Sequence, residues 1–437
     1  MRMRLRWCAM HGFLRFVAGR AAAAGDLQAR LIADPSARKD PTGLYGEIRE
    51  AAPVVRSRLA SVTVDHGIVH DTLRSDDFRT IVLGSRLPGP LKWIEERTRS
   101  GALHPLRPPS LLATEPPEHT TYRKLVSSVF TARAVASLRD NVQETADRLL
   151  DGLMDQSGPI DIVERYCAEL PVAVISDILG VPESERGRVL EFGELAAPSL
   201  DMGLTWAQFT RVETGLIGFD QWLSDHLATL RRNPGDDLMS QLIRATDDGV
   251  SLTDDELRAT AGLVLAAGFE TTVNILGSGI DLLIKHPEQL AILQENPTLW
   301  ANAADEMLRL QAPVQITARV ARRDVEVGGE TLSKGDLMVL VLAGANRDPN
   351  VFTDPERFDV TRENANKHLS FSGGRHFCLG SALARAETEV GLKSLFDRFP
   401  QIASAGQGTK RDTRVLNGFA RLPVLLAQPS REDAHSR

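Results

Sequence analysis

Cysteine is scarce in this sequence. Only Cys8, Cys167 and Cys378 occur among 437 residues, and no two of them have CxxC spacing. An odd and sparse count excludes a disulfide framework and favours a reducing compartment, which we expect to be the cytoplasm. Each cysteine therefore needs an explanation of its own.

Long apolar runs and a strong excess of one charge are also absent. The longest stretch without Asp, Glu, Lys or Arg is Ala259–Phe269, well short of the ~18–20 residues that span a bilayer. We therefore expect no transmembrane segment. The net charge of −7 gives no indication of nucleic-acid binding. A hydrophobic content of 42% with 25% charged residues is typical of a soluble globular protein.

The first twenty residues carry arginines and no acid. Arg15 interrupts any signal-peptide core, so secretion is not expected. Four apolar residues would share one helix face: Trp7, Met10, Leu14 and Val17. Two interpretations stay open for residues 1–24. They form either a frayed extension or a basic amphipathic helix that rests weakly on an anionic membrane surface.

No repeat, low-complexity block or Gly/Ser linker divides the rest, so one catalytic domain is expected over residues 25–430, followed by a polar tail over 431–437. Short β patterns occur at Val54–Arg58, Val62–Val64, Val325–Leu332 and Leu337–Leu342. Longer helical patterns occur at Arg133–Leu153, Trp206–Leu230, Asp254–Lys285, Thr298–Leu310 and Leu379–Phe399. The sequence predicts a mainly α domain with small β-sheets.

The helix predicted over Asp254–Lys285 is unusual. Thr253 and Glu256 form a capping-box pattern at its start. Its ~32 residues would run ~48 Å, so it should cross the whole domain. Gly268 and the polar cluster Glu270-Thr271-Thr272 interrupt its apolar middle. Such local violations suggest a functional site, and we expect the helix to open there through a π-bulge or a displaced hydrogen bond.

Cys378 lies in a glycine-rich loop, FSGGRHFCLG, directly before a helical pattern. Glycines there let the backbone approach a ligand closely. Backbone N–H groups, the helix dipole and the charges of Arg375 and His376 would favour the thiolate. The loop alone leaves two interpretations open, a buried structural cysteine or a ligand to a metal whose other ligands come from a cofactor. A catalytic nucleophile is disfavoured, because His376 could hardly turn to meet it.

FSGGRHFCLG resembles the haem-binding loop of the cytochrome P450 family. The matching residues are Phe371, Gly374, His376, Cys378 and Gly380. Ser372 stands where many bacterial members have glycine. Further segments follow in the family's order: TEPPEHTTYRKL, AGFETT, the ExxR motif, ARVARRD and DPERF. The resemblance covers roughly Gly25 to Gln428, and GDLQARLIADP is similar to soluble actinobacterial members, including mycobacterial ones.

This resemblance implies the cytochrome P450 fold, with haem b between the long central helix and the cysteine loop, and Cys378 as the thiolate ligand of the iron. Phe371 would shield the sulfur from water, and Gly268 and Gly380 would lie against the cofactor. The residues implied for the haem propionates are His119, Arg123, Arg319 and His376. The network implied to support the cysteine loop is Glu306, Arg309 and Arg357. In the oxygen-binding segment, Thr271 would hydrogen-bond O2 and Glu270 would supply protons through water.

The implied activity is that of a haem-thiolate monooxygenase, which hydroxylates or epoxidises a lipophilic substrate with O2 and two electrons. A polyketide, fatty acyl chain, terpenoid or steroid would each fit. Weak candidates for substrate contacts are Trp93, Leu106, Val264, Ala267, Val314 and Ile316, with the segment Leu200–Trp206. No flavin or nicotinamide segment is present, so a ferredoxin and its reductase should supply electrons, with Lys124, Arg375 and Arg385 as candidate contacts.

Two alternatives stay open. A haem-based sensor or carrier would bind a lipophile without turnover. A peroxide-driven or isomerising haem-thiolate enzyme would not need external electrons. The Glu270-Thr271 pair argues against both, because neither needs a proton relay.

Overall fold

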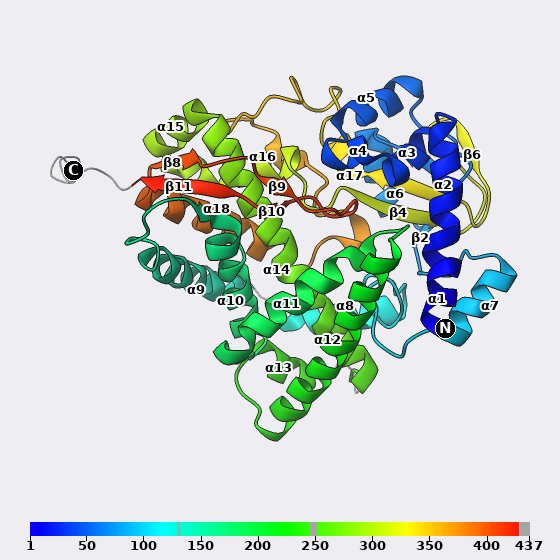
Figure 1. Ribbon diagram of the computed structural model, residues 1–437, viewed down its shortest axis with the longest axis horizontal. Coiled ribbons are helices and arrows are strands. Elements are labelled where there is room, and N and C mark those ends of the chain that lie inside the picture. Colours follow the sequence, from blue (N-terminus) through cyan, green and yellow to red (C-terminus); the bar gives the residue numbers. More distant parts are fainter. Residues whose placement is uncertain (130–131, 245–250, 428–437) are drawn as a thin grey trace.

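The computed structural model describes residues 1–129, 132–244 and 251–427. Figure 1 shows most of the long helices on one side of the molecule, and the four-stranded sheet with the N-terminal helices on the other. The helices of the first half are α1 Arg2–Trp7, η1 Cys8–Gly12, α2 Phe13–Ala23, α3 Leu27–Ala33, α4 Pro35–Lys39, α5 Thr42–Ala51, α6 His66–Arg74, α7 Gly89–Thr98, α8 Glu118–Val129, α9 Ala132–Asp151, η2 Val163–Cys167, α10 Glu169–Ile178, η3 Glu183–Glu185, α11 Arg186–Ala196 and η4 Ala197–Leu200.

The helices of the second half are α12 Trp206–Arg232, α13 Leu238–Arg244, α14 Asp254–Lys285, α15 Pro287–Glu295, η5 Pro297–Leu299, α16 Trp300–Leu310, α17 Leu342–Ala345, η6 Ala365–Lys367, η7 Gly374–His376 and α18 Ser381–Arg398. The mainly α architecture predicted from the sequence is confirmed. The predicted tail, residues 431–437, lies outside the described residues.

Four small sheets accompany the helices. Their strands are β1 Ser61–Thr63, β2 Phe78–Thr80, β3 Ile160–Asp161, β4 Ile316–Ala321, β5 Val325–Val327, β6 Glu330–Leu332, β7 Leu337–Val341, β8 Gln401–Ser404, β9 Thr409–Lys410, β10 Phe419–Arg421 and β11 Pro423–Ala427. The largest sheet has the order β1-β7-β4-β2, in which β1 and β7 are parallel and the other pairs antiparallel. The Val54–Arg58 pattern supplies only an isolated bridge from Val55 to Val62.

The long helix α14 has the bounds that the sequence predicts. Its capping box forms, since Thr253 N donates to Glu256 (2.7 Å) and Glu256 N to Thr253 Oγ1 (3.4 Å). It packs against α10, α12 and α18, and most of its length is buried. Within the described part of the chain it is the one helix long and apolar enough to cross a membrane, and 67% of its apolar window is buried inside the protein. It is therefore a core helix.

The prediction that α14 opens near Gly268 is wrong. The helix is continuous α from end to end, and the two threonines of AGFETT bond back to it. Thr271 Oγ1 donates to Ala267 O (3.0 Å) and Thr272 Oγ1 to Gly268 O (3.2 Å). Gly268 is needed for packing, because a Cβ there would lie 3.1 Å from Ile175 Cδ1.

The N-terminal residues do not form a frayed extension. The helices α1, η1 and α2 run without a break from Arg2 to Ala23 and pack on the body of the protein. Met10 is 3% exposed and Ala18 is fully buried. Trp7 Nε1 donates to Leu204 O (2.9 Å), and Arg15 donates to Gly203 O (2.8 Å). The helix α2 ends at Ala23 and packs against α3, which begins at Leu27.

Candidate active site

Cys378 lies between η7 and the start of α18, and its backbone N–H donates to Phe371 O (2.9 Å). Two left-handed residues shape the loop, Ser372 (φ 61°) and Gly374 (φ 63°). A Cβ at Gly374 would lie 2.4 Å from Leu73 O, so this glycine lets the loop approach α6 rather than a ligand. A Cβ at Gly380 would meet nothing within 4 Å, so this glycine faces open space.

The Cys378 thiol is not a thiolate by virtue of the loop alone. Burial raises its pKa, and the Gly380 N–H with the charges of Arg123 and Arg385 lowers it by less. The backbone N–H and the nearby cations favour the thiolate as expected, but the effect of burial on the pKa is larger. A bound cation would deprotonate the sulfur outright, so the donor set is that of a metal-ligating cysteine.

The cysteine loop is held from behind by α16 and α18. Asp305 of α16 accepts from Arg385 Nε of α18 (2.6 Å) and lies 3.2 Å from His368 Nε2. The Arg385 guanidinium lies over the Phe371 ring, 4.7 Å from its centroid. Phe371 is therefore fixed beside the cysteine, and Arg385, a candidate ferredoxin contact, is committed to the loop.

Glu306 and Arg309 form a buried ion pair, with Nε to Oε2 at 2.6 Å and both side chains fully inaccessible. Arg309 also donates to the carbonyls of Asn346 (3.0 Å) and Pro355 (2.7 Å). The third charged member is Arg362, whose Nε lies 3.1 Å from Glu306 Oε1.

The prediction of Arg357 as that third member is wrong. Its side chain is 64% exposed, and its nearest acid is Asp359 at 3.9 Å. Only its backbone carbonyl joins the network, as an acceptor from Arg309 (3.2 Å). The cause is local geometry, since the chain turns at Asp354 and brings Arg362 rather than Arg357 back onto α16.

The structure brings most of the predicted propionate ligands together. His119 of α8 and His376 of η7 lie with ring centroids 4.4 Å apart. His376 Nε2 is buried without a hydrogen-bond partner and lies 3.7 Å from Glu115 Oε1. Burial lowers the pKa of His119 to about 4, helped by the charges of His376 and Arg123.

Arg319 projects from β4 near the same cluster. Burial lowers its pKa to about 10, and the nearby Glu115 carboxyl raises it in part. Its Nη1 donates to Thr317 Oγ1 (3.3 Å) and Ala318 O (2.9 Å). Arg123 instead reaches the cysteine loop, where Nη2 donates to Phe377 O (2.7 Å).

Glu115 is an acid within this cationic cluster, and no pattern in the sequence marks it as a site residue. Burial would raise its pKa, but the neighbouring His376 and the hydrogen bonds from Thr80 hold it at about 2. It also pairs with Arg322 (2.6 Å) and Arg375 (3.4 Å). Three arginines interact with Glu115, namely Arg319, Arg322 and Arg375, and Asp76 also pairs with Arg375. The guanidinium groups outnumber the two carboxylates, and such groups suit a ligand that carries carboxylates.

One face of α14 opens onto space although the helix is otherwise core. Val264 and Thr271 are partly exposed and Ala267, between them, is exposed. The spacing of three and four residues puts all three on one helix face. Together with open space at Gly380 and the unpaired His376, this face matches a large planar group with anionic substituents. The fold and these residues define a haem-thiolate protein.

Glu270 does not share that open face. Its side chain is buried and its Oε1 lies 3.2 Å from Arg411 Nε, between β9 and β10. Burial raises the pKa of Glu270, while Arg411 opposes that rise. Arg411 was not found from the sequence, because nothing near it marks it as a partner of α14.

A second buried acid joins α14 to the cysteine-loop helix. Glu387 of α18 is 2% exposed, and its Oε2 accepts from Thr272 Oγ1 (3.1 Å). Burial raises its pKa to about 8 against the effect of Thr272, so this carboxyl is mostly protonated at neutral pH. The sequence did not mark Glu387 as a site residue, because a glutamate in a helix usually lies on the surface.

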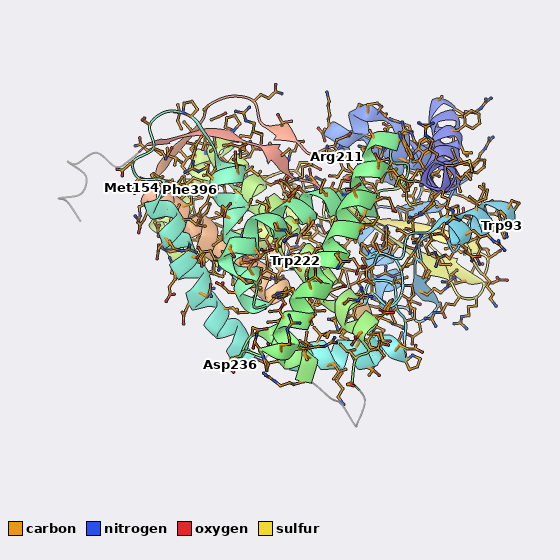
Figure 2. The ribbon with its side chains drawn as sticks, turned by 60° about the horizontal axis from the view of Figure 1, so that its bottom comes forward. Trp93, Met154, Arg211, Trp222, Asp236 and Phe396 are labelled. Carbon is orange, nitrogen blue, oxygen red and sulfur yellow. The ribbon has the colours of Figure 1, made fainter. Side chains whose placement is uncertain are left out.

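The candidate substrate contacts divide into two groups. Val264 and Ala267 lie on the open face of α14, and Val314 and Ile316 are partly buried around the start of β4. Trp93 of α7 is 57% exposed and stands at the edge of the molecule (Figure 2), so its assignment as a substrate contact is wrong. Leu106 pairs with Leu83 through the backbone (2.9 Å).

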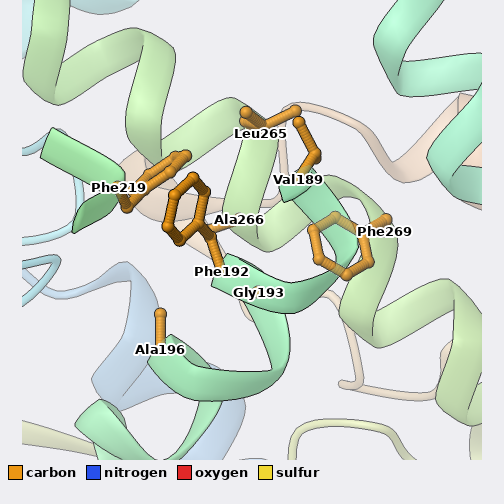
Figure 3. A pocket seen from close by; sticks show the side chains of 8 residues that line it. All are labelled: Val189, Phe192, Gly193, Ala196, Phe219, Leu265, Ala266 and Phe269. Carbon is orange, nitrogen blue, oxygen red and sulfur yellow. The ribbon is translucent and has the colours of Figure 1, made fainter. Parts of the chain in front are cut away.

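An apolar recess too tight to admit a water molecule lies between α11, α12 and α14 (Figure 3). It is lined by Val189, Phe192, Gly193, Ala196, Phe219, Leu265, Ala266 and Phe269. The Phe269 ring lies against Gly193, where a Cβ would be 1.7 Å from its Cζ. The recess is closely packed and contains none of the predicted site residues.

Comparison with known proteins agrees with this site. The family model for cytochrome P450 matches residues 200–425. A putative cytochrome P450 140 of Mycobacterium tuberculosis is 59% identical over 429 residues, 98% of each chain. The 6-deoxyerythronolide B hydroxylase of Saccharopolyspora erythraea is 42% identical over 318 residues, 72% of this chain and 77% of that one. The ligand-free structure of Mycobacterium smegmatis CYP164A2 superposes with a TM-score of 0.80 at 33% identity, over 91% and 99% of the two chains.

The chain belongs to the cytochrome P450 family. It is a P450 monooxygenase of actinobacterial type that binds haem b through a cysteine thiolate. Like its relatives it requires a redox partner, O2 and a lipophilic substrate.

Proposed function

We propose that this enzyme inserts one atom of O2 into a C–H bond or a C=C bond of a lipophilic substrate, and that the second atom leaves as water. The observation that carries the substrate class is the open face of α14, where Val264 and Ala267 offer apolar surface about two turns and one turn before Thr271. The similarity to a macrolide hydroxylase supports a polyketide first, with fatty acyl chains, terpenoids and steroids next.

The residues of this chain would divide the work as follows. Cys378 would ligate the haem iron, and the haem when bound supplies the oxidising chemistry of a thiolate-ligated iron. His119, Arg319 and His376 would hold the propionates, with Gly380 against the porphyrin. Phe371, fixed by Arg385, would keep water from the sulfur.

On the opposite face Thr271 would position O2 by its hydroxyl. This hydroxyl donates to Ala267 O at 3.0 Å, and it can accept a hydrogen bond while it does so. Glu270, protonated more readily because it is buried, would pass protons toward Thr271 through water, and Arg411 would position it.

Electrons would come from a ferredoxin and its reductase in the cytoplasm. The face beside the cysteine loop carries Arg123, Lys124 and Arg375, and Arg123 touches the loop at Phe377 O. Arg375 pairs with Asp76 and Glu115, and these two carboxylates weaken its attraction for an acidic ferredoxin.

A spectral screen tests this function. The purified protein should contain haem, and its reduced CO complex should show the long-wavelength Soret band of thiolate ligation. Macrolactones, fatty acyl chains, terpenoids and steroids are then titrated for the shift from low to high spin, and products of the best ligand are analysed with ferredoxin, reductase and NAD(P)H. Ligand binding with no oxygenated product under these conditions would support a carrier or sensor instead.

A further inference from the structure

The N-terminal helical segment, Arg2–Ala23, has an apolar outer face as well as the inner one that docks it. On the outer side Leu5 is 46% exposed, Phe13 52% and Phe16 62%. These side chains remain uncovered although the segment already buries Met10 and Ala18 against the protein. Large apolar side chains gathered on an exposed surface usually mark an interaction site.

The inner face fixes how this segment is presented. Arg6 is 2% exposed and forms an ion pair with Glu213 of α12. His11 Nδ1 accepts from Leu204 N (3.2 Å), and Trp7 and Arg15 bind the backbone of the same loop. Because these contacts are specific, the outer face is held rigidly outward rather than exposed by fraying.

The neighbouring helix α7 adds a further exposed aromatic side chain. It packs against α1 and η1, and Trp93 projects from it at the edge of the molecule (Figure 2). Arg97 lies over the Trp93 ring at 4.9 Å, and Arg20 lies over the Phe16 ring at 5.5 Å. We name Leu5, Phe13, Phe16 and Trp93 the N-terminal patch.

Charge around the N-terminal patch is opposite to that of the whole chain. The exposed cations of α1, α2 and α7 are Arg2, Arg4, Arg15, Arg20, Lys92 and Arg97, and the exposed acid of these three helices is Glu96. The whole chain has a net charge of −7. A local positive surface on an acidic protein selects an anionic partner.

We propose that the N-terminal patch docks this enzyme on the surface of an anionic lipid bilayer. The apolar side chains project outward from helices rather than line a groove, and Trp, Phe and Leu among arginines are the composition of interfacial helices. Arginine stems can lie along the apolar side chains while their guanidinium groups reach lipid phosphates. The same helix holds Gly203 and Leu204, so the bilayer would lie beside the segment 200–206 that was expected to contact substrate.

Vesicle flotation tests the proposal with the haem-loaded full-length protein. Vesicles of equal parts phosphatidylglycerol and phosphatidylcholine should carry wild-type protein, and vesicles of phosphatidylcholine alone should carry much less. The triple variant Phe13→Gln, Phe16→Gln, Trp93→Gln should partition about tenfold less or lower, because it loses three inserted aromatic rings. The matched control is Ile217→Gln, Leu425→Gln, which removes two apolar side chains exposed elsewhere (48% and 41%) and should bind like wild type.

Two further measurements separate the electrostatic attraction of the arginines from the insertion of apolar side chains. Arg2→Gln, Arg20→Gln should weaken binding to the anionic vesicles, and added salt should do the same. Brominated lipid should quench the fluorescence of Trp93, and this quenching should vanish in Trp93→Gln. An unchanged haem spectrum shows that each variant is folded. Failure of wild type to bind anionic vesicles, equal binding by the triple variant, or binding to an acidic protein in place of the vesicles would each overturn the proposal.

Discussion

Arg411 Nε lies 3.2 Å from Glu270 Oε1, in a position where both side chains are nearly buried. This pair ties the acid of the AGFETT segment to the C-terminal strands β9 and β10. Successive helix residues point about 100° apart, so Glu270 and Thr271 cannot both face the haem side. The acid therefore lies behind the alcohol, and any proton exchange between them needs water or a rotation of Glu270.

Replacing Arg411 should change how activity depends on pH. Burial already raises the pKa of Glu270 and the guanidinium opposes this, so Arg411→Gln should raise that pKa further. The inflection of the pH–kcat profile that belongs to Glu270 should then move to higher pH, with a smaller change in KM. Arg421→Gln is the control, because Arg421 is 70% exposed on β10. Identical profiles for Arg411→Gln and wild type would remove Arg411 from this role.

Thr271→Ala should uncouple electron consumption from product formation. The variant loses the hydroxyl that lies on the open face of α14, so peroxide released per NAD(P)H should rise several-fold in the presence of substrate. Thr272→Val is a close control, since Thr272 is buried and bonds Glu387 instead. That variant should lose about 1 kcal/mol of stability yet stay coupled. Equal coupling in wild type and Thr271→Ala would contradict the assignment.

Removing the side chain of Arg362 should destabilise the protein far more than removing that of Arg357. Arg362 is 8% exposed and pairs with fully buried Glu306, so Arg362→Ala strands a buried charge and should cost about 3–5 kcal/mol. Arg357→Ala removes an exposed side chain and should cost no more than about 1 kcal/mol. Thermal unfolding and the fraction of protein that retains haem measure both. Haem loss in Arg357→Ala with retention in Arg362→Ala would show that Arg357, and not Arg362, is the third member of the network.

The features that could be predicted from the sequence are those set by residues close together along the chain. The bounds of α14 follow from a capping box and a proline, both local, and the Glu306–Arg309 pair follows from one helix turn. The family resemblance implied that His119, His376 and Arg319 lie together, and the structure brings them to one cluster. Each of these signals is contained in a short segment.

The remaining site residues depend on contacts between distant segments. Arg411 and Glu387 reach α14 from 141 and 115 residues further along the chain, counted from Glu270 and Thr272, and no local pattern marks either. The choice of Arg362 over Arg357 is set by a turn at Asp354 with positive φ. The docking of the N-terminal segment likewise rests on Glu213 and Leu204, which only the tertiary fold brings to it.

His11 should make the stability of the protein depend on pH. It is 4% exposed, and burial, with the charges of Arg6, Arg15 and Arg414, lowers its pKa from 6.5 to about 4. Glu213 also faces the helix turn that carries His11, and its carboxylate forms an ion pair with Arg6. Between pH 6.5 and about 4 the unfolded chain therefore binds a proton at His11 that the folded chain does not.

Stability should consequently fall as pH drops through this window and level off below it, by on the order of 3 kcal/mol from this one group. His11→Gln keeps an acceptor for Leu204 N but cannot take up the proton, so its free energy of unfolding should fall less between pH 7 and pH 4. Urea unfolding of the holoprotein at a series of pH values gives the two slopes. The exposed His70 supplies the control, because His70→Gln should leave the wild-type slope in place. Parallel slopes for His11→Gln and wild type would mean that His11 is already protonated in the folded protein, and that its ring is not sealed between the N-terminal helix and Leu204.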